Sequence, residues 1–278
     1  MATIASELKP FEWWGRYMKD MKQPVFYQIA PDGVAEETIQ RIRSTFREYT
    51  PEQEGQGLLL KVGEDGVELH ADGQTLKGDF TRMLPRLKAG NLSKELLVRA
   101  ARIKGAEGPL TAVDATAGLG EDSLVLGAAG FQVKLYERNP VVYELLNDAV
   151  KRAANLPELA DIVAQMQVFY GDSVQGMSGL ETPPDVILLD PMFPARQKSA
   201  LVKKKLQTIQ KLELPCLDEE ELIFAAMGAR PKKLIVKRPP KGPWLAGIKP
   251  DHSVEGKAVR YDCFVSPYDR IQKFKKEK

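Results

Sequence analysis

The stretch Asp114–Gly120 reads Asp-Ala-Thr-Ala-Gly-Leu-Gly and decides which fold is expected for this chain of 278 residues. A short apolar strand is predicted to lead into it and a helix is predicted to follow it. Glycines and other small residues between a strand and a helix let the backbone approach a ligand closely. We therefore expect a ligand-binding turn here. The residues predicted to lie beside the ligand are Asp114, Gly118 and Gly120.

Strands and helices alternate beyond this turn. Apolar strands are predicted over 112–115, 132–136, 167–170, 186–189 and 234–236. Helices are predicted between them, including one that Asn139 caps with Pro140 in its first turn. Two more strands, over 253–258 and 261–265, break the alternation, and one of them is expected to be antiparallel. Buried strands joined by helices predict a doubly wound, mostly parallel, seven-stranded α/β sheet.

The first ninety residues have a different pattern. A strand is predicted over 25–29, a helix over 34–49, and a hairpin around the turn Gly63–Gly66. A helix over 91–104, stopped by Gly105, is predicted to join this part to the rest. We therefore expect two units. They are a small N-terminal α+β module over 1–90 and a larger domain over 91–278.

Composition excludes several classes of protein. No apolar run is long enough to span a membrane, and two cysteines with two histidines do not make a disulfide scaffold or a convincing metal site. We therefore expect a cytoplasmic protein without a metal. The net charge is only +2, but 196–211 holds six basic residues and 230–249 holds seven, with no acidic residue in either stretch. Both stretches flank the predicted site and are interpreted as a rim for nucleic-acid phosphates.

Acidic residues around the turn indicate the kind of ligand. Glu137 ends the second predicted strand of the sheet, where a carboxylate accepts hydrogen bonds from both hydroxyls of a ribose. Ser123 stands where a dinucleotide-binding turn has its third glycine. Asp114, Glu121 and Asp122 repel a pyrophosphate but suit the ammonium and sulfonium groups of S-adenosylmethionine (SAM). SAM is therefore the expected cofactor.

Two further strand ends carry polar side chains. Asp172 and Ser173 follow the third strand and are expected at the adenine edge of the cofactor. Asp190-Pro-Met-Phe-Pro194 follows the buried strand 186–189. Asp190 is predicted to accept a hydrogen bond from an exocyclic amine, which is otherwise a poor nucleophile. Phe193 is predicted to stack on the base.

Together these motifs resemble the bacterial small-subunit ribosomal RNA (guanine-N2) methyltransferase J family. The matching stretches are Val113–Gly120, Glu137–Pro140, Asp190–Pro194, Gln197–Lys204 and Val236–Pro239. The resemblance implies a Rossmann-like methyltransferase sheet. It also implies direct transfer of a methyl group from SAM to the N2 amine of one guanine. The partner that it implies is small-subunit (16S) ribosomal RNA or the 30S subunit.

The resemblance also implies which residues contact the cofactor. They are Glu121, Asp122, Glu137, Arg138, Asp172, Ser173 and Asp190. Glu121 departs from the family, which commonly has arginine there, and Asp172 replaces a small hydroxyl residue. Two alternatives stay open. One is methylation of another amine, such as adenine N6 or a protein glutamine, and the other is a non-catalytic RNA-binding ribosome assembly factor.

Overall fold

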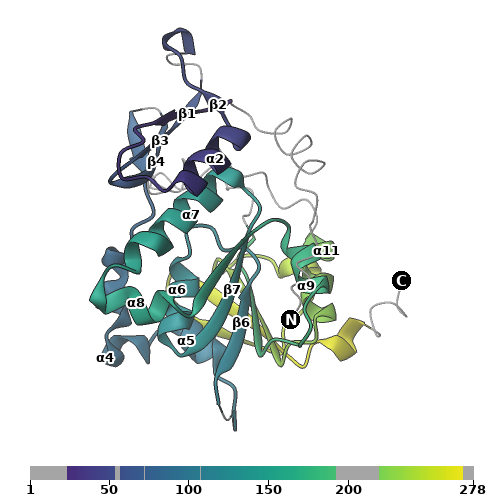
Figure 1. Cartoon of the computed structure of the whole chain (residues 1–278). Helices are drawn as coiled ribbons and strands as arrows, with labels where there is room; N and C mark the ends of the chain where they lie inside the picture. Colours follow the sequence, from purple (N-terminus) through teal and green to yellow (C-terminus); the bar gives the residue numbers. More distant parts are fainter. Residues whose placement is uncertain (1–23, 54–56, 72, 107, 192–218, 272–278) are drawn as a thin grey trace, which may run out of the picture.

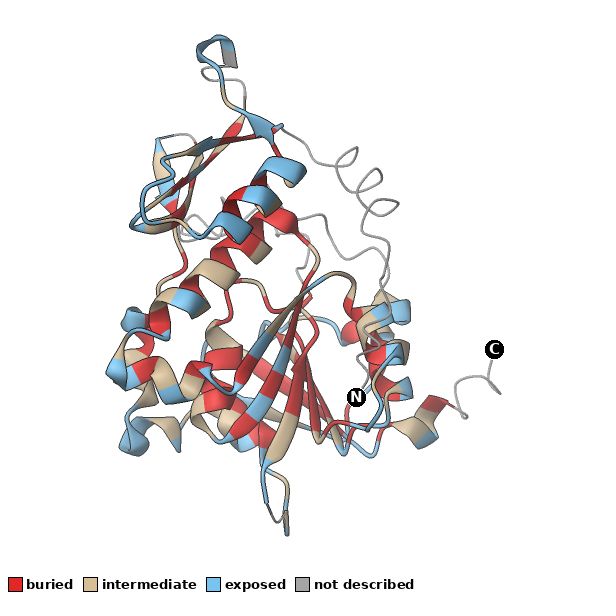
Figure 2. Cartoon of the chain, viewed as in Figure 1, coloured by how far each residue is buried: buried red, intermediate tan, exposed pale blue. Residues whose placement is uncertain are grey.

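The computed structural model describes residues 24–53, 57–71, 73–106, 108–191 and 219–271 (Figure 1). Two β-sheets organise these residues, one of seven strands and one of five. Figure 2 shows that buried residues concentrate in the strands of the larger sheet and on the faces of the helices that cover it. No helix in these ranges is long and apolar enough to cross a membrane.

The larger sheet has the strand order β11-β12-β10-β9-β6-β7-β8. Its strands are β6 (Leu110–Asp114), β7 (Phe131–Glu137), β8 (Met166–Tyr170), β9 (Val186–Leu189), β10 (Lys233–Arg238), β11 (His252–Glu255) and β12 (Arg260–Val265). The pairs β6–β7, β7–β8, β6–β9 and β9–β10 are parallel, whereas β12 is antiparallel to both neighbours. The predicted seven-stranded, mostly parallel sheet is confirmed, including one antiparallel strand.

Helices cover both faces of this sheet (Figure 1). The helices on one face are α5 (Leu96–Ala101), α6 (Glu121–Ala128), α7 (Pro140–Ala153) and α8 (Pro157–Val163). The helices on the other face are α9 (Ser173–Ser178) and α11 (Glu219–Gly228). As predicted, Asn139 caps α7, because its side chain accepts hydrogen bonds from the backbone N–H groups of Val141 and Val142 at 2.9 and 3.2 Å.

The smaller sheet has the order β2-β1-β3-β4-β5. Its strands are β1 (Val25–Ile29), β2 (Arg47–Glu48), β3 (Leu58–Gly63), β4 (Gly66–Ala71) and β5 (Gln74–Leu76). The helix α2 (Glu36–Thr45) packs with this sheet, and the 3-10 turn η1 (Pro51–Gln53) follows β2. The predicted hairpin is confirmed, since β3 and β4 pair up to Gly63 and Gly66.

Helix α7 lies between the two sheets, as Figure 1 shows. Val141, Val142 and Leu145 share a buried cluster with the small sheet, and Leu146 packs into the core of the large one. Arg41 of α2 adds a bidentate ion pair to the buried Glu144 of α7, at 2.6 and 2.8 Å. The division of the chain at residue 90 stays a prediction.

Two predicted helices were wrong in extent. The chain over 91–104 does not form one helix, because α4 (Ala89–Leu92) ends before α5 begins at Leu96. Glu95 between them is extended, and its carboxylate is held by Arg86 at 2.9 and 2.8 Å. The helix predicted over 34–49 ends at Thr45, since the following residues pair with β1 as β2. Helices α8 and α9 and strand β5 were not predicted.

Candidate active site

The predicted site residues meet at the carboxyl ends of four neighbouring strands. Asp114 ends β6 and Glu137 lies at the end of β7. Asp190 follows β9 directly, and Lys237 lies near the end of β10. Because the order is β10-β9-β6-β7, these side chains line one edge of the sheet. That edge is where ligands bind in open parallel sheets.

The glycine-rich turn has a packed side and an open side. Gly118 and Gly120 both have left-handed backbones, with φ of 55° and 78°. A Cβ atom on Gly120 would lie 2.6 Å from Cδ1 of Leu146 and 3.2 Å from Cζ of Phe80. A Cβ atom on Gly118 would meet no atom of the chain within 4 Å. Gly120 therefore allows close packing at the start of α6, whereas Gly118 faces space that a ligand can enter.

Asp114 stabilises the glycine-rich turn through hydrogen bonds. Its carboxylate accepts hydrogen bonds from Oγ of Ser123 at 2.5 Å and from the backbone N–H of Thr116 at 3.1 Å. The side chain is buried, and burial raises its pKa to about 7. The hydroxyl of Thr116 accepts a hydrogen bond from the backbone N–H of Asp190 at 2.6 Å. The turn is thus tied to the end of β9, and contact of Asp114 with the cofactor stays a prediction.

Glu137 is held by the backbone on both sides. One carboxylate oxygen accepts from the N–H of Gly118 at 2.9 Å and the other from the N–H of Asn139 at 2.7 Å. Burial raises the pKa of Glu137 to about 7, against the lowering effect of these hydrogen bonds and of Arg138. Each carboxylate oxygen can accept a second hydrogen bond. The carboxylate is therefore fixed in place with acceptor capacity remaining.

Asp172 and Ser173 start α9, next to the end of β7. The Asp172 side chain caps this helix by accepting from the N–H of Val174 at 2.8 Å, and Ser173 is buried. The helix cap gives a physical reason for an aspartate at this position. Glu121 and Asp122 lie in the first turn of α6. The predicted cofactor contacts of these four residues stay predictions.

Lys237, which the sequence analysis placed in the phosphate rim, lies instead among the predicted site acids. Its ammonium lies 2.6 Å from Oδ2 of Asp122 and 2.9 Å from Oδ2 of Asp190, so it bridges two of the predicted site acids. Burial lowers the pKa of Lys237, but these two carboxylates outweigh burial and raise it above its usual value. The surrounding protein partly desolvates Asp190, whose side chain is 40% exposed, and this raises its pKa, while the Lys237 ammonium opposes that rise. The signal in the sequence was the acid-rich set of neighbouring strand ends.

The phosphate rim predicted over 230–249 is wrong as a single surface. Lys237 is occupied by two carboxylates, and the Arg238 side chain is fully buried. Lys233 lies at the opposite edge of the sheet, where it donates to backbone carbonyls of Ala100 and Arg102. Phe193 and the basic stretch 196–211 lie outside the described residues.

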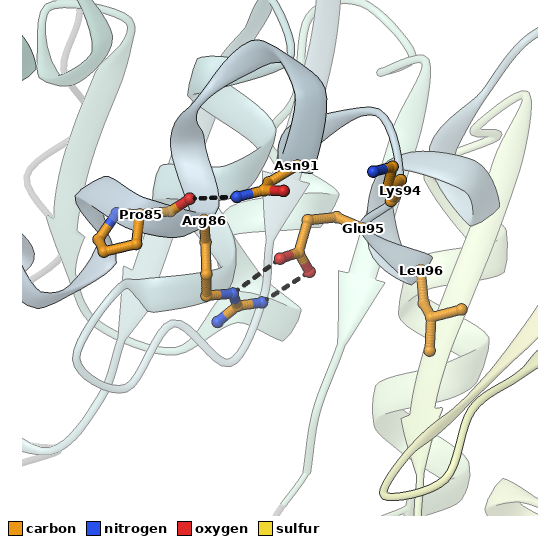
Figure 3. Close-up of a pocket in the computed structure, with 6 residues that line it drawn as sticks. All are labelled: Pro85, Arg86, Asn91, Lys94, Glu95 and Leu96. Atoms are coloured by element: carbon orange, nitrogen blue, oxygen red, sulfur yellow. Dashed lines mark hydrogen bonds and ion pairs between the residues drawn. The ribbon is translucent and has the colours of Figure 1, made fainter.

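A cavity of about 380 Å³ lies on the short helices α3 (Leu84–Leu87), α4 and α5 (Figure 3). Its lining residues are Pro85, Arg86, Asn91, Lys94, Glu95 and Leu96. Figure 3 shows that Arg86 pairs with Glu95 and that Asn91 donates to the carbonyl of Pro85, at 2.8 Å. None of the predicted site residues lines it. Within the described part of the chain, no group of three or more His, Cys, Asp or Glu side chains is arranged to hold a metal ion.

The chain is similar to known methyltransferases along most of its length. Residues 45–266 match the family described as "Putative SAM-dependent methyltransferase". The chain is 41% identical over 216 residues to ribosomal RNA small subunit methyltransferase J of Marinobacter nauticus, covering 75% of this chain and 77% of that protein. It is 43% identical over 223 residues to the protein of the same name from Thioalkalivibrio sulfidiphilus, covering 77% and 87%.

A solved structure has the same architecture. The crystal structure of a SAM-dependent methyltransferase from Neisseria gonorrhoeae matches with a TM-score of 0.66 and 28% sequence identity, covering 88% of this chain and 96% of that one. The chain therefore belongs to the ribosomal RNA small subunit methyltransferase J family of SAM-dependent, Rossmann-like methyltransferases.

Proposed function

We propose that this protein methylates the exocyclic N2 amine of a guanine in small-subunit ribosomal RNA. The observation that carries the proposal is Asp190, whose carboxylate lies at the end of β9 and is held by Lys237 at 2.9 Å. An acceptor in this position, tied through Thr116 to the glycine turn, suits an amine substrate beside the cofactor. The names of the relatives support ribosomal RNA of the small subunit as the substrate.

The residues at the glycine turn fit SAM. Gly118 faces open space, so the cofactor can lie against its backbone. Glu137 is fixed at the end of β7 with acceptor capacity remaining, which suits the two ribose hydroxyls. Asp172 and Ser173 would adjoin the adenine, and Arg138 would lie beside the ribose. When bound, SAM supplies a methyl group activated by a positively charged sulfur.

Asp190 would accept a hydrogen bond from the target amine. The lone pair of an exocyclic amine is delocalised into the base, so the nitrogen must rehybridise before it can attack. A carboxylate that accepts a hydrogen bond from the amine N–H favours this change, and the hydrogen bond strengthens as the nitrogen gains positive charge. The Asp190 side chain is 40% exposed, so a proton released from the amine has a path to solvent. Phe193 would stack on the guanine and fix its plane.

Lys237 would keep Asp190 ready for this role. A carboxyl group that is already protonated at the working pH accepts a weaker hydrogen bond and cannot take a further proton. The nearby ammonium favours the ionised form of Asp190, against burial and against the charge of Asp122. Lys237 is thus a positioning residue in this proposal. Such an enzyme would act in the cytoplasm, where ribosomal RNA is assembled into subunits.

The direct test is methyl transfer from radiolabelled SAM to three substrates from cells lacking the modification: naked small-subunit RNA, free 30S subunits and intact ribosomes. We expect label in the RNA of at least one of them, and N2-methylguanosine after digestion and mass spectrometry. Detection of N6-methyladenosine, or of methylated glutamine in a ribosomal protein, would identify another amine as the methyl acceptor in place of guanine N2. Binding of RNA with no transfer to any substrate would favour an assembly factor.

A further inference from the structure

The segment 239–250, between β10 and β11, displays an aromatic side chain at the active-site edge; we call it the Trp244 loop. Trp244 is 41% exposed, whereas Leu245 beside it is 1% exposed. The loop follows β10, and Lys237 of that strand contacts Asp190. It therefore leaves the sheet at the same carboxyl edge as the proposed methyl-transfer site.

Two arginines fix the loop before Trp244. Arg260 donates to the carbonyl of Pro240 at 2.8 Å and to that of Gly242 at 3.2 Å, while Asp262 holds its other N–H groups at 2.8 and 2.9 Å. Arg238 donates to the carbonyl of Pro243 at 2.7 Å. Both arginines are buried, and each extends from a strand of the large sheet, Arg238 from β10 and Arg260 from β12. The backbone that leads to Trp244 is thus held firmly.

The loop is equally well anchored after Trp244. Leu245 and Ile248 lie in the buried cluster under α11. Ala246 has a left-handed backbone, with φ of 49°, and its N–H donates to Glu219 at 3.1 Å. A non-glycine residue keeps such a backbone where its surroundings determine it. The indole is therefore exposed on a loop that is fixed on both sides, which removes much of the entropy cost of binding through it.

The charge of the loop indicates what it binds. Lys241 is exposed three residues before Trp244, and segment 239–245 contains no acidic residue. An exposed aromatic ring with a neighbouring ammonium group is the combination that binds unpaired nucleotides, since every base has a face to stack and every phosphate is negative. A purely apolar partner would not call for Lys241.

We propose that Trp244 is a stacking site for an unpaired base of the RNA substrate close to the target nucleotide, and that Lys241 contacts an adjoining phosphate. This inference rests on the proposed function, because it assumes an RNA substrate at this edge of the sheet. The site is separate from the glycine turn and from Asp190. Its loss weakens RNA binding and leaves the binding of SAM unchanged.

The test compares Trp244→Ala, Trp244→Phe and Lys241→Ala with the wild type in binding to a labelled small-subunit RNA fragment at several salt concentrations. Trp244→Ala should lower affinity by about fivefold to a hundredfold without changing the slope of log affinity against log salt. Lys241→Ala should reduce that slope by about 0.7. Trp244→Phe should keep most of the affinity, because a phenyl ring still stacks.

Val265→Ala is the matched control. Val265 is 50% exposed and pairs with Lys233 at the start of β10, away from the carboxyl ends of the parallel strands. Its truncation should therefore leave RNA binding unchanged. If Trp244→Ala bound RNA with wild-type affinity, the stacking site would be overturned but the proposed function would not. A loss seen with 30S subunits but not with naked RNA would also overturn it, in favour of a ribosomal protein. If the wild-type enzyme itself bound no RNA, the proposed function would fail as well. Calorimetry with SAM checks that each variant keeps its cofactor site.

Discussion

The two sides of the site hold their acids in different ways. On the β6–β7 side, Asp114 and Glu137 are buried and accept hydrogen bonds from backbone N–H groups and a serine hydroxyl, and burial raises the pKa of both to about 7. On the β9–β10 side, Asp190 shares the ammonium of Lys237 with Asp122 of α6. The first arrangement fixes acceptors for neutral hydroxyls, whereas the second maintains a negative charge. We infer that one side binds the cofactor and the other serves the chemistry.

The largest expected effect is on the β9 side. Asp190→Ala removes the proposed acceptor for the amine, an interaction that strengthens as charge develops on the nitrogen. We expect the rate of methyl transfer to fall by about a hundredfold to a thousandfold. The affinity for RNA should change far less, which filter binding measures in parallel. Near wild-type turnover by this variant would exclude Asp190 from the reaction.

Lys237 should be the next most sensitive position. Lys237→Met removes the ammonium, so the pKa of Asp190 rises and the acidic limb of the pH–rate profile moves to higher pH. The other charged or titratable groups around Asp190 are Asp114, Asp122, Arg238 and Tyr261. They remain in the variant, so the shift reports the loss of one ammonium.

Two further variants complete the Lys237 test. Lys237→Arg should restore much of the wild-type profile, because it keeps the positive charge. Lys232→Met is the control, since Lys232 is 64% exposed and pairs with Asp185 at the other end of β10. An unmoved pH profile in Lys237→Met would reduce Lys237 to a structural role.

A smaller effect is expected on the β7 side. Glu137→Gln keeps a similar shape but loses the charge that strengthens hydrogen bonds from the ribose, and it replaces one of the two acceptor oxygens with an NH2 donor. We expect the affinity for SAM to fall by about tenfold in calorimetry. Glu144→Gln is a matched control, because Glu144 is a buried glutamate that pairs with Arg41 at the small sheet. Equal losses of SAM affinity in the two variants would place the ribose contact elsewhere.

The two glycines of the turn should separate stability from binding. Gly118→Ala strains the left-handed backbone by about 1–2 kcal/mol, and its methyl group projects into the space proposed for SAM. Gly120→Ala adds overpacking against Leu146 and Phe80, which costs about 1–3 kcal/mol more. Denaturant unfolding should therefore show Gly120→Ala as the less stable variant. Greater destabilisation by Gly118→Ala would contradict the assignment of an open side and a packed side.

The raised pKa of Asp114 predicts that the stability of the fold depends on pH. The native state binds a proton here at higher pH than the unfolded state does, so the group favours folding at low pH and loses that contribution as pH rises toward 7. Asp114→Asn should remove this part of the dependence. The unfolding free energy of the wild type minus that of the variant should therefore decrease from pH 5 to pH 7. An increase in this quantity over the same range would contradict the raised pKa of Asp114.

The sequence predicted the parts of the fold that depend on local patterns. Continuous apolar strands such as Val186–Leu189 and the cap at Asn139 are visible in the residues themselves. The break before Leu96 was missed because it depends on Arg86 reaching Glu95 across nine residues. The pairing of Lys237 was missed because it requires β10 to lie beside β9, a tertiary relation that charge counts do not contain.

The most direct test of the division between the two sides is the rate of transfer at saturating SAM for Glu137→Gln and Asp190→Asn, with RNA in excess. We expect Glu137→Gln to recover most of the wild-type rate once SAM is saturating, because its defect is in binding. Asp190→Asn should stay slow at any SAM concentration, because its defect is in the chemical step. A Glu137→Gln enzyme that stays as slow as Asp190→Asn, or an Asp190→Asn enzyme whose rate SAM restores, would contradict the division of cofactor binding and chemistry between the two sides.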